Sequence, residues 1–365
     1  MSKKIKILIA AGGTGGHVIP GCNLAKHLIE KDYDIELVSD VRGNQYLEKI
    51  KDLEITTLPS SPLKTKNFYS FFISSTLIFY SILKSLLYLI FNRPSLVIGM
   101  GGYASFPICI AAGILKIKMI IYENNLVIGK ANKYLLPFVK NIIVSFKDIE
   151  GIPVKYNNKI IEIGNIIKKE IINFSDESKK DIQINGLSII ILGGSQAAKI
   201  FADTLPSIFL KCSTHGIPLK VYQQCLPSQN EKLSFFFKNN NIDFEIFNFK
   251  DNLKDYFSKV NLAITRSGSS ILAELTNSNI PFISVPLPTS ADNHQLKNAL
   301  FYKKKKLAFL IKEKDLNDDL FNLIKEIYQN NLILNNIKKN QRQYSDKNVY
   351  NNINQVLKKI INEKN

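Results

Sequence analysis

The chain has 365 residues, 45% of them hydrophobic, and this length suits two domains that each bury a full core. Its four cysteines form no C-x-x-C pair, which argues against a disulfide framework or a zinc site and favours a reducing compartment. The formal net charge of +17 suits nucleic acid or an anionic membrane, but lysine is abundant throughout and no nucleic-acid-binding signature accompanies it, so we expect no nucleic-acid partner.

Short apolar runs rich in β-branched residues alternate with longer helical stretches. We expect strands at residues 5–10, 35–38, 55–58, 96–99, 119–122 and 142–145, and again at 187–192, 219–222, 244–247, 262–265, 282–285 and 308–310. Such runs, when helices separate them, are typical of parallel sheets covered on both faces. Lys6 and the following glycines interrupt the apolar N-terminus, which predicts a first strand and not a signal peptide. The sequence therefore predicts an α/β protein with two Rossmann-like domains.

The strand pattern restarts near residue 187, after a polar stretch. We therefore expect residues 1–163 to form the first domain and residues 164–340 the second. The tail, residues 341–365, predicts a polar helix with one apolar stripe, formed by Val349, Ile353, Val356, Leu357 and Ile360. Such a stripe must dock on a domain, and either domain could receive it.

Residues 68–91 are almost wholly apolar, with Lys84 as the only charge. The stretch is long enough to be a transmembrane helix. Its serines and Lys84 recur near helical spacing, however, and form one narrow polar stripe. The segment could lie on or dip into a membrane surface, pack in a core, or span a bilayer. Because a span would place strands of the first sheet in different compartments, we favour the membrane surface.

A glycine-rich turn, GGTGGH at residues 12–17, lies between the first predicted strand and a helix. Glycine lets the backbone approach a ligand closely, and the N-terminus of the following helix suits a phosphate. Asp40, at the end of the second strand, could imitate the ribose-binding acid of a dinucleotide site. That fingerprint needs glycine where Val18 stands, so an NAD site is the weaker interpretation.

Polar side chains gather at the ends of three predicted strands of the first domain. His17 follows the first strand and could act as a general base or donate to a phosphate, whereas His27 and His215 lack such a context and are expected on the surface. Gly101, Gly102 and Tyr103 form a second glycine turn. Glu123 is a candidate acid or base, and Asn125 could bind a sugar hydroxyl.

Three loops of the second half repeat the strand–loop–helix pattern. Ser195 follows a third glycine pair, which could hold a phosphate. Ser269 and Ser270 begin a helix in which Glu274 could accept both hydroxyls of a ribose, although the helix dipole alone also favours a glutamate there. His294 and Gln295 follow another strand and could bind the hydroxyls of a sugar.

Taken in order, these motifs resemble those of the bacterial lipid I N-acetylglucosaminyltransferase (MurG) family. The motifs are GGTGGH at 12–17, GMGGY at 99–103, ENN at 123–125, GN at 164–165, GGSQ at 193–196, RSG at 266–268 with Glu274, and DNHQ at 292–295. The resemblance implies the GT-B glycosyltransferase fold, in which two Rossmann-like domains face each other across a cleft. It implies inverting transfer of N-acetylglucosamine from UDP-N-acetylglucosamine to the C4 hydroxyl of MurNAc in undecaprenyl-pyrophosphoryl-MurNAc-pentapeptide (lipid I), which gives lipid II for peptidoglycan synthesis.

The resemblance also assigns residues to the two substrates. It implies donor contacts for Thr14, Gly15, Gly16, Asn125, Lys168, Ser195, Lys250, Ser269, Ser270, Ile271, Leu272, Ala273, Glu274, His294 and Gln295, and acceptor contacts for Gly101, Gly102 and Tyr103. Lys168 stands where the family usually has an arginine; it keeps the positive charge but cannot form the two parallel hydrogen bonds of a guanidinium. Lys250 stands where the family often has an apolar residue. We expect His17 to take the proton of the acceptor hydroxyl, with Glu123 as the alternative base.

Other implications concern location and cofactors. The first domain, joined by the final helix 341–365, would meet lipid I and the anionic inner membrane from the cytoplasmic side as a peripheral membrane protein. The second domain would bind the UDP-sugar. No D-x-D motif occurs in the corresponding context, so we expect no metal and no cofactor, and glycine and serine loops would stabilise the charge of the leaving UDP.

Three other functions suit the same architecture. A glycolipid synthase would also need the apolar segment 68–91, whereas a nucleotide-sugar 2-epimerase would not. A membrane-bound nucleotide-sugar binding subunit without catalytic activity is the third, and His17 in the same chain as both substrate loops argues against it.

Overall fold

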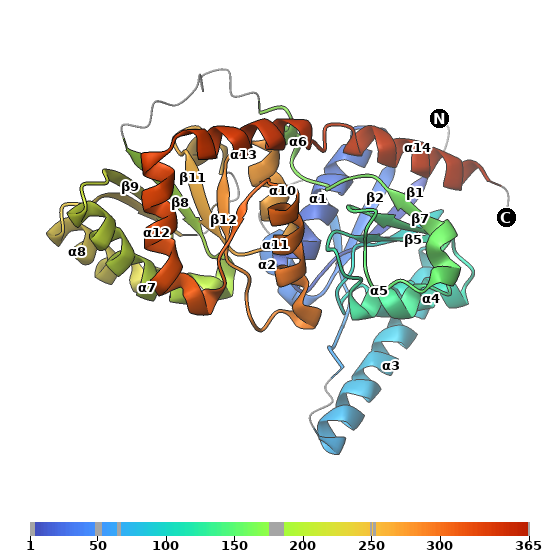
Figure 1. Cartoon of the computed structure of the whole chain (residues 1–365). Coiled ribbons are helices and arrows are strands. Elements are labelled where there is room, and N and C mark those ends of the chain that lie inside the picture. The colour runs from blue at the N-terminus through green and yellow to red at the C-terminus, as the bar shows by residue number, and fades with distance from the viewer. Residues whose placement is uncertain are drawn as a thin grey trace. The chain divides into compact units, whose positions relative to one another are not determined.

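A computed structural model of the chain describes residues 4–47, 53–63, 67–174, 186–248, 250 and 253–363. It divides into two compact units (Figure 1). Unit 1 comprises Met1–Lys169 and Asp346–Asn365, and unit 2 comprises Glu170–Ser345. Each unit contains one parallel β-sheet with helices on both sides.

The sheet of unit 1 has seven strands in the order β3-β2-β1-β4-β5-β6-β7. They are β1 (Lys6–Ala10), β2 (Asp34–Ser39), β3 (Glu54–Thr57), β4 (Leu96–Gly99), β5 (Met119–Glu123), β6 (Asn141–Val144) and β7 (Ile160–Glu162). Its helices are α1 (Gly15–Ile29), α2 (Val41–Leu47), α3 (Phe68–Phe91), α4 (Phe106–Ile114), α5 (Lys130–Leu135) and α14 (Val349–Asn362). Helix α6 (Lys169–Ile172) begins at the last residue before the boundary and continues into unit 2. One core cluster joins Leu8 of β1 to Leu89 of α3, Ile108 of α4 and Leu135 of α5.

The sheet of unit 2 has six strands in the order β10-β9-β8-β11-β12-β13. They are β8 (Leu187–Leu192), β9 (Leu219–Gln224), β10 (Asp243–Phe247), β11 (Leu262–Thr265), β12 (Phe282–Ser284) and β13 (Phe309–Leu310). The helices are α7 (Gly194–Thr214), α8 (Asn230–Asn239), α9 (Lys254–Phe257), α10 (Ser269–Asn277), α11 (His294–Lys304), α12 (Leu316–Gln329) and α13 (Leu332–Gln343). Ile189, Phe209, Phe237 and Ile324 lie in its core.

All twelve predicted strands are present, and the predicted fold class is confirmed. One strand, β7, was not predicted. Its three residues lie at the edge of the sheet and are half-buried or exposed, so they show no continuous apolar run. Since apolar periodicity reports burial on both faces, an edge strand of this kind gives little signal.

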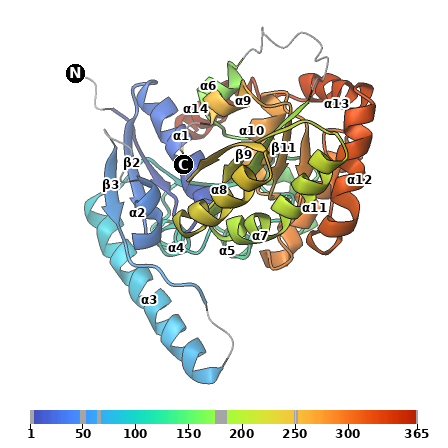
Figure 2. The ribbon, with the colours of Figure 1, turned by 90° about the vertical axis from the view of Figure 1, so that its left-hand side faces the viewer.

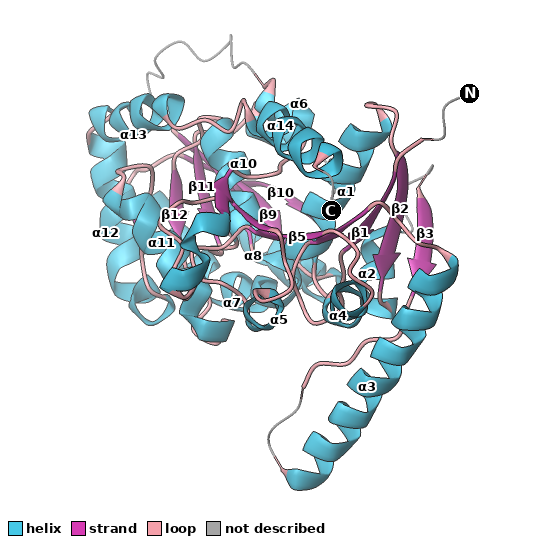
Figure 3. Cartoon of the chain, turned by 90° about the vertical axis from the view of Figure 1, so that its right-hand side faces the viewer, coloured by secondary structure: helices cyan, strands magenta, loops and turns pink. Residues whose placement is uncertain are grey.

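Helix α3 buries three serines of its polar stripe and exposes Lys84 and most of its apolar residues. Ser74, Ser81 and Ser85 are buried, and each hydroxyl donates to a carbonyl of its own helix at 2.7–3.0 Å. Exposed side chains include Phe68, Tyr69, Phe72, Phe79, Leu87 and Phe91. Figures 2 and 3 show the helix extending away from the strands of unit 1. Most of its apolar side chains therefore lie outside the core, contrary to the core-packing interpretation, whereas Leu89 packs within it.

Helix α14 covers the last turn of α1 in unit 1. His27 is buried there, with its ring 4.4 Å from the ring of Tyr350 and Nε2 2.9 Å from the Asn354 side-chain oxygen. The expectation of a surface position for His27 is therefore wrong, because the covering helix comes from residues more than 320 positions away. His215 is exposed, as expected.

Candidate active site

Apart from Lys168, which follows β7, the predicted site residues of unit 1 lie at the carboxyl ends of β1, β4 and β5. These strands are neighbours in the sheet, and strand order reverses between β1 and β4. Ligands of open α/β sheets bind at such a reversal. The topology therefore brings together His17, the Gly101–Gly102 turn and Glu123, which are far apart in the sequence.

The ring of His17 packs against the second glycine turn. Its Nδ1 lies 3.0 Å from the carbonyl oxygen of Met100. Since a carbonyl oxygen can only accept, Nδ1 donates, and in the neutral ring the proton-accepting nitrogen is Nε2. Gly101 and Gly102 adopt φ values of +91° and +78°, and a Cβ on either would lie 3.0 Å from the His17 ring. Glycine is thus required for the ring to occupy this position.

The Glu123 carboxylate organises the loop that follows β5. It is buried, and Oε1 accepts the backbone N–H of Asn125 at 3.2 Å and its side-chain amide at 3.0 Å. Oε2 accepts the Gly129 N–H at 2.9 Å and the Asn132 amide at 3.0 Å. Four donors therefore hold this carboxylate, which favours an anchoring role for it over proton transfer.

The first glycine turn leads into α1. Thr14 precedes the helix in an extended conformation, and its carbonyl accepts the N–H of His17 at 3.1 Å. Gly15 and Gly16 form the start of the helix, whose first turn holds no acidic residue. The Asn124 amide donates to the Gly16 carbonyl at 3.0 Å and joins the loops after β1 and β5. This helix N-terminus suits an anionic group.

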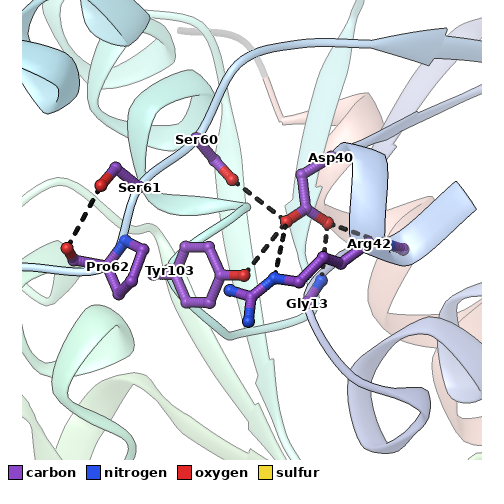
Figure 4. A network of polar contacts seen from close by, with 8 residues as sticks. Gly13, Asp40, Arg42, Ser60, Ser61, Pro62 and Tyr103 are labelled. Atoms are coloured by element: carbon purple, nitrogen blue, oxygen red, sulfur yellow. Dashed lines mark hydrogen bonds and ion pairs between the residues drawn. The ribbon is translucent and has the colours of Figure 1, made fainter.

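Tyr103 ends the second glycine turn. Its hydroxyl donates to Asp40 Oδ2 at 3.1 Å, as Figure 4 shows. The Arg42 guanidinium lies 4.6 Å from the centre of its ring. These two contacts hold the side chain of Tyr103, which is half-buried, so part of its surface is accessible.

In unit 2, Ser269 and Ser270 are the first two residues of α10. Gly268 caps the helix in an extended conformation, and the first turn contains no acidic residue. Glu274 is half-buried one turn further. Of the intervening residues, Ile271 is partly exposed, whereas the side chains of Leu272 and Ala273 lie in the core. Any ligand contact by these two residues would therefore involve their backbone.

Gln295 joins two loops of unit 2. Its Oε1 accepts the N–H of Ser267 at 3.2 Å, after β11, and the N–H of Leu287 at 3.0 Å, after β12. His294 begins α11, and its Nδ1 lies 2.8 Å from the carbonyl of Ala291. The structure thus places Gln295 beside the turn that leads into α10.

The sequence analysis did not identify Arg266, which joins the loop after β11 to the loop after β12. Its guanidinium is buried, donates to the carbonyls of Val285 and Pro286 at 3.2 and 3.3 Å, and pairs with Glu313. The residue is part of the RSG motif, and an arginine directly after a buried strand was the available signal.

Three further predicted donor residues belong to other elements than α10. Lys250 donates to the Tyr256 hydroxyl at 2.7 Å, and this bond raises the pKa of Lys250; burial raises the pKa of Tyr256. Lys168 is half-buried and belongs to unit 1. Ser195 is in the first turn of α7, and its side chain lies outside the described part of the structure.

Comparisons with known proteins place both units in one family. Residues 7–144 match the glycosyltransferase family 28 N-terminal domain, and residues 188–356 match its C-terminal domain. A relative from Pelagibacter ubique (strain HTCC1062) is 35% identical over 359 residues, which cover 98% of this chain and 99% of the relative. That relative is named UDP-N-acetylglucosamine–N-acetylmuramyl-(pentapeptide) pyrophosphoryl-undecaprenol N-acetylglucosamine transferase.

Solved structures show the same fold. The crystal structure of Acinetobacter baumannii MurG matches with a TM-score of 0.77 at 22% identity, covering 98% of this chain and all of that one. A UDP-N-acetylglucosamine 2-epimerase matches with a TM-score of 0.63 at 12% identity, covering 97% and 96% of the two chains. At these identities the likeness concerns the fold, which transferases and epimerases share.

Proposed function

Because this chain belongs to glycosyltransferase family 28, we propose that it transfers N-acetylglucosamine from UDP-N-acetylglucosamine to the MurNAc C4 hydroxyl of lipid I, which yields lipid II. The observation that carries the proposal is the 35% identity to a transferase of that name over 98% of the chain. The structural likeness to an epimerase does not compete with it, because only 12% of the residues agree there.

In this proposal, His17 is the general base. Its Nδ1 is held by the Met100 carbonyl, so Nε2 is the nitrogen that accepts the proton of the attacking hydroxyl. The Gly101–Gly102 turn would supply backbone N–H groups for the acceptor pyrophosphate, and Thr14, Gly15 and Gly16 at the N-terminus of α1 would contact the donor. Glu123 keeps Asn125 in place through the bonds to its carboxylate.

The donor is assigned mainly to unit 2. The N-terminus of α10 would receive the UDP pyrophosphate, since its amides and dipole stabilise the negative charge that grows on the leaving group. Glu274 would accept the ribose hydroxyls, and Gln295 would contact the sugar beside the same turn. Helix dipoles would here supply the stabilisation that a metal provides in other transferases.

Helix α3 is the proposed membrane contact, which would place the enzyme peripherally on the cytoplasmic side of the inner membrane. It is the one described helix that is long and apolar enough to cross a bilayer, and only 22% of its apolar window is buried. Its 24 residues extend about 36 Å, with aromatic side chains exposed along its length. An exposed apolar surface of this size favours a lipid partner, and the net charge of +17 favours an anionic one.

The test is an assay with radiolabelled UDP-N-acetylglucosamine, with and without a soluble lipid I analogue. The proposal predicts acceptor-dependent label in the lipid product, joined by a β-linkage. Label that moves to UDP-N-acetylmannosamine without acceptor would indicate an epimerase instead. Nucleotide-sugar binding without turnover, in the presence of acceptor, would indicate a binding subunit and contradict the proposal.

A further inference from the structure

We propose that Asp40 is a positioning residue for the acceptor side of the reaction, which acts through the hydroxyl of Tyr103. This inference rests on the proposed function. Asp40 directly follows β2, outside the loops that carry His17 and the second glycine turn. It is nevertheless the carboxylate on which the loops around Tyr103 converge (Figure 4).

The carboxylate of Asp40 is buried and bound on both oxygens. Oδ1 accepts the backbone N–H of Gly13 at 2.8 Å and that of Gly43 at 2.9 Å. Oδ2 accepts the hydroxyls of Tyr103 at 3.1 Å and Ser60 at 3.2 Å. A carboxylate whose acceptor positions are filled by protein donors is not placed to bind a ribose, which removes the dinucleotide interpretation of this residue.

The first glycine turn depends on this carboxylate. Gly13 has φ +83°, a conformation that L-residues seldom adopt, and its N–H points at Asp40. A Cβ on Gly12 would lie 2.7 Å from Asp40 Oδ1, so only glycine lets the backbone come this close to the carboxylate. Oδ1 therefore fixes the path of the backbone into α1, which carries His17.

The other oxygen fixes Tyr103. The edge of its ring lies against Gly13, where a Cβ would be 3.5 Å from Tyr103 Cε1. Its hydroxyl donates to Oδ2, and a hydrogen bond to a charged acceptor is stronger than one between neutral groups. One carboxylate thus sets the separation between the first glycine turn and the loop proposed to bind the acceptor pyrophosphate.

The inference predicts a selective effect on the acceptor. Asp40→Asn keeps an oxygen for the two backbone N–H groups and removes the charge that orients the Tyr103 hydroxyl. We expect the KM for a lipid I analogue to rise about tenfold, while the KM for UDP-N-acetylglucosamine stays within about twofold. Tyr103→Phe should produce the same change, and the double variant should be no worse than either single one.

Ser60→Ala is the matched control, because it removes the second hydroxyl donor from the same oxygen and leaves Tyr103 in place. It should leave both KM values unchanged. Equal increases in the two KM values, additive effects in the double variant, or a lower melting temperature with normal kinetics would each overturn the inference. If Asp40→Asn does not fold, the test is the acceptor KM of the other two variants: it should rise in Tyr103→Phe and stay unchanged in Ser60→Ala. A wild-type chain that makes no product would instead contradict the proposed function, and the inference with it.

Discussion

At the scale of single residues, the geometry around His17 depends on glycine more than on any charged group. The ring lies against Gly101 and Gly102, which both need a positive φ and leave no room for a Cβ. Position and tautomer of the proposed base are therefore set by backbone atoms, namely this turn and the Met100 carbonyl. Backbone contacts of this kind are rigid, which suits a group that must be in place before reaction.

Gly102→Ala should therefore reduce turnover by about 100-fold, because the new methyl group would displace the His17 ring. It should also lower the free energy of unfolding by about 1–2 kcal/mol, since alanine is strained at φ +78°. Gly216→Ala is the control, because φ is +74° there and nothing lies within 4 Å of the added Cβ. Thermal unfolding should show a similar loss for both variants. If Gly216→Ala lost activity equally, general destabilisation would explain the result.

The sequence indicated the positions of these residues but not the contacts that hold them. Glu123 is a candidate acid or base because it ends a buried strand at the edge of the sheet where polar side chains gather. Its four donors come from residues 125–132, and no spacing rule shows that they turn back onto the carboxylate. Asp40 likewise matched the ribose-binding acid of a different site.

At the scale of elements, α3 is an amphipathic helix whose apolar side faces outward. The serine stripe was visible in the sequence, but its direction was not, because a stripe can face water or protein equally well. In the structure the stripe faces the protein, because Ser74, Ser81 and Ser85 are buried and their hydroxyls bond to carbonyls of their own helix.

Phe72→Ser together with Phe79→Ser should lower recovery of the protein with anionic vesicles in flotation. Both side chains are more than 60% exposed, so the free energy of unfolding should change by less than about 0.5 kcal/mol per site. Phe235→Ser, on the exposed side of α8 in unit 2, removes an equally exposed phenylalanine and should leave flotation unchanged. Unchanged flotation of the double variant would show that α3 does not contact lipid.

The contact of α14 with α1 should be sensitive to acid. Burial lowers the pKa of His27 below its ordinary value of 6.5, although the bond to Asn354 opposes this, and Lys169 and Lys31 lower it further while Glu30 raises it. The unfolded chain then binds a proton that the folded chain does not, so stability is full above about pH 6.5 and falls as the pH drops towards the folded pKa. The melting temperature should decrease between about pH 7.5 and pH 5.5.

His27→Gln should make that decrease smaller, because glutamine does not titrate. His215→Gln, at an exposed site, should retain the full decrease. A pH dependence unaffected by His27→Gln would assign the acid sensitivity to other groups.

At the scale of the whole molecule, the sequence predicted two parallel-sheet units because buried strands leave a strong apolar signal. The apolar pattern does not predict β7, because its residues are half-buried or exposed. It also does not predict the burial of His27, because the partner Asn354 comes from a distant part of the chain. Unit 1 ends with residues Asp346–Asn365, which return after the whole of unit 2. The proposed function assigns the acceptor contacts to unit 1 and most of the donor contacts to unit 2.

The central claim is that this family 28 chain transfers N-acetylglucosamine to lipid I with His17 as the base. The most direct measurement is single-turnover transfer from UDP-N-acetylglucosamine to a lipid I analogue by the His17→Ala variant, with donor binding measured by calorimetry. We predict that transfer falls by about 10²–10⁴-fold while donor affinity is preserved, and that His215→Ala behaves like the wild type. Transfer at the wild-type rate by His17→Ala would contradict the account.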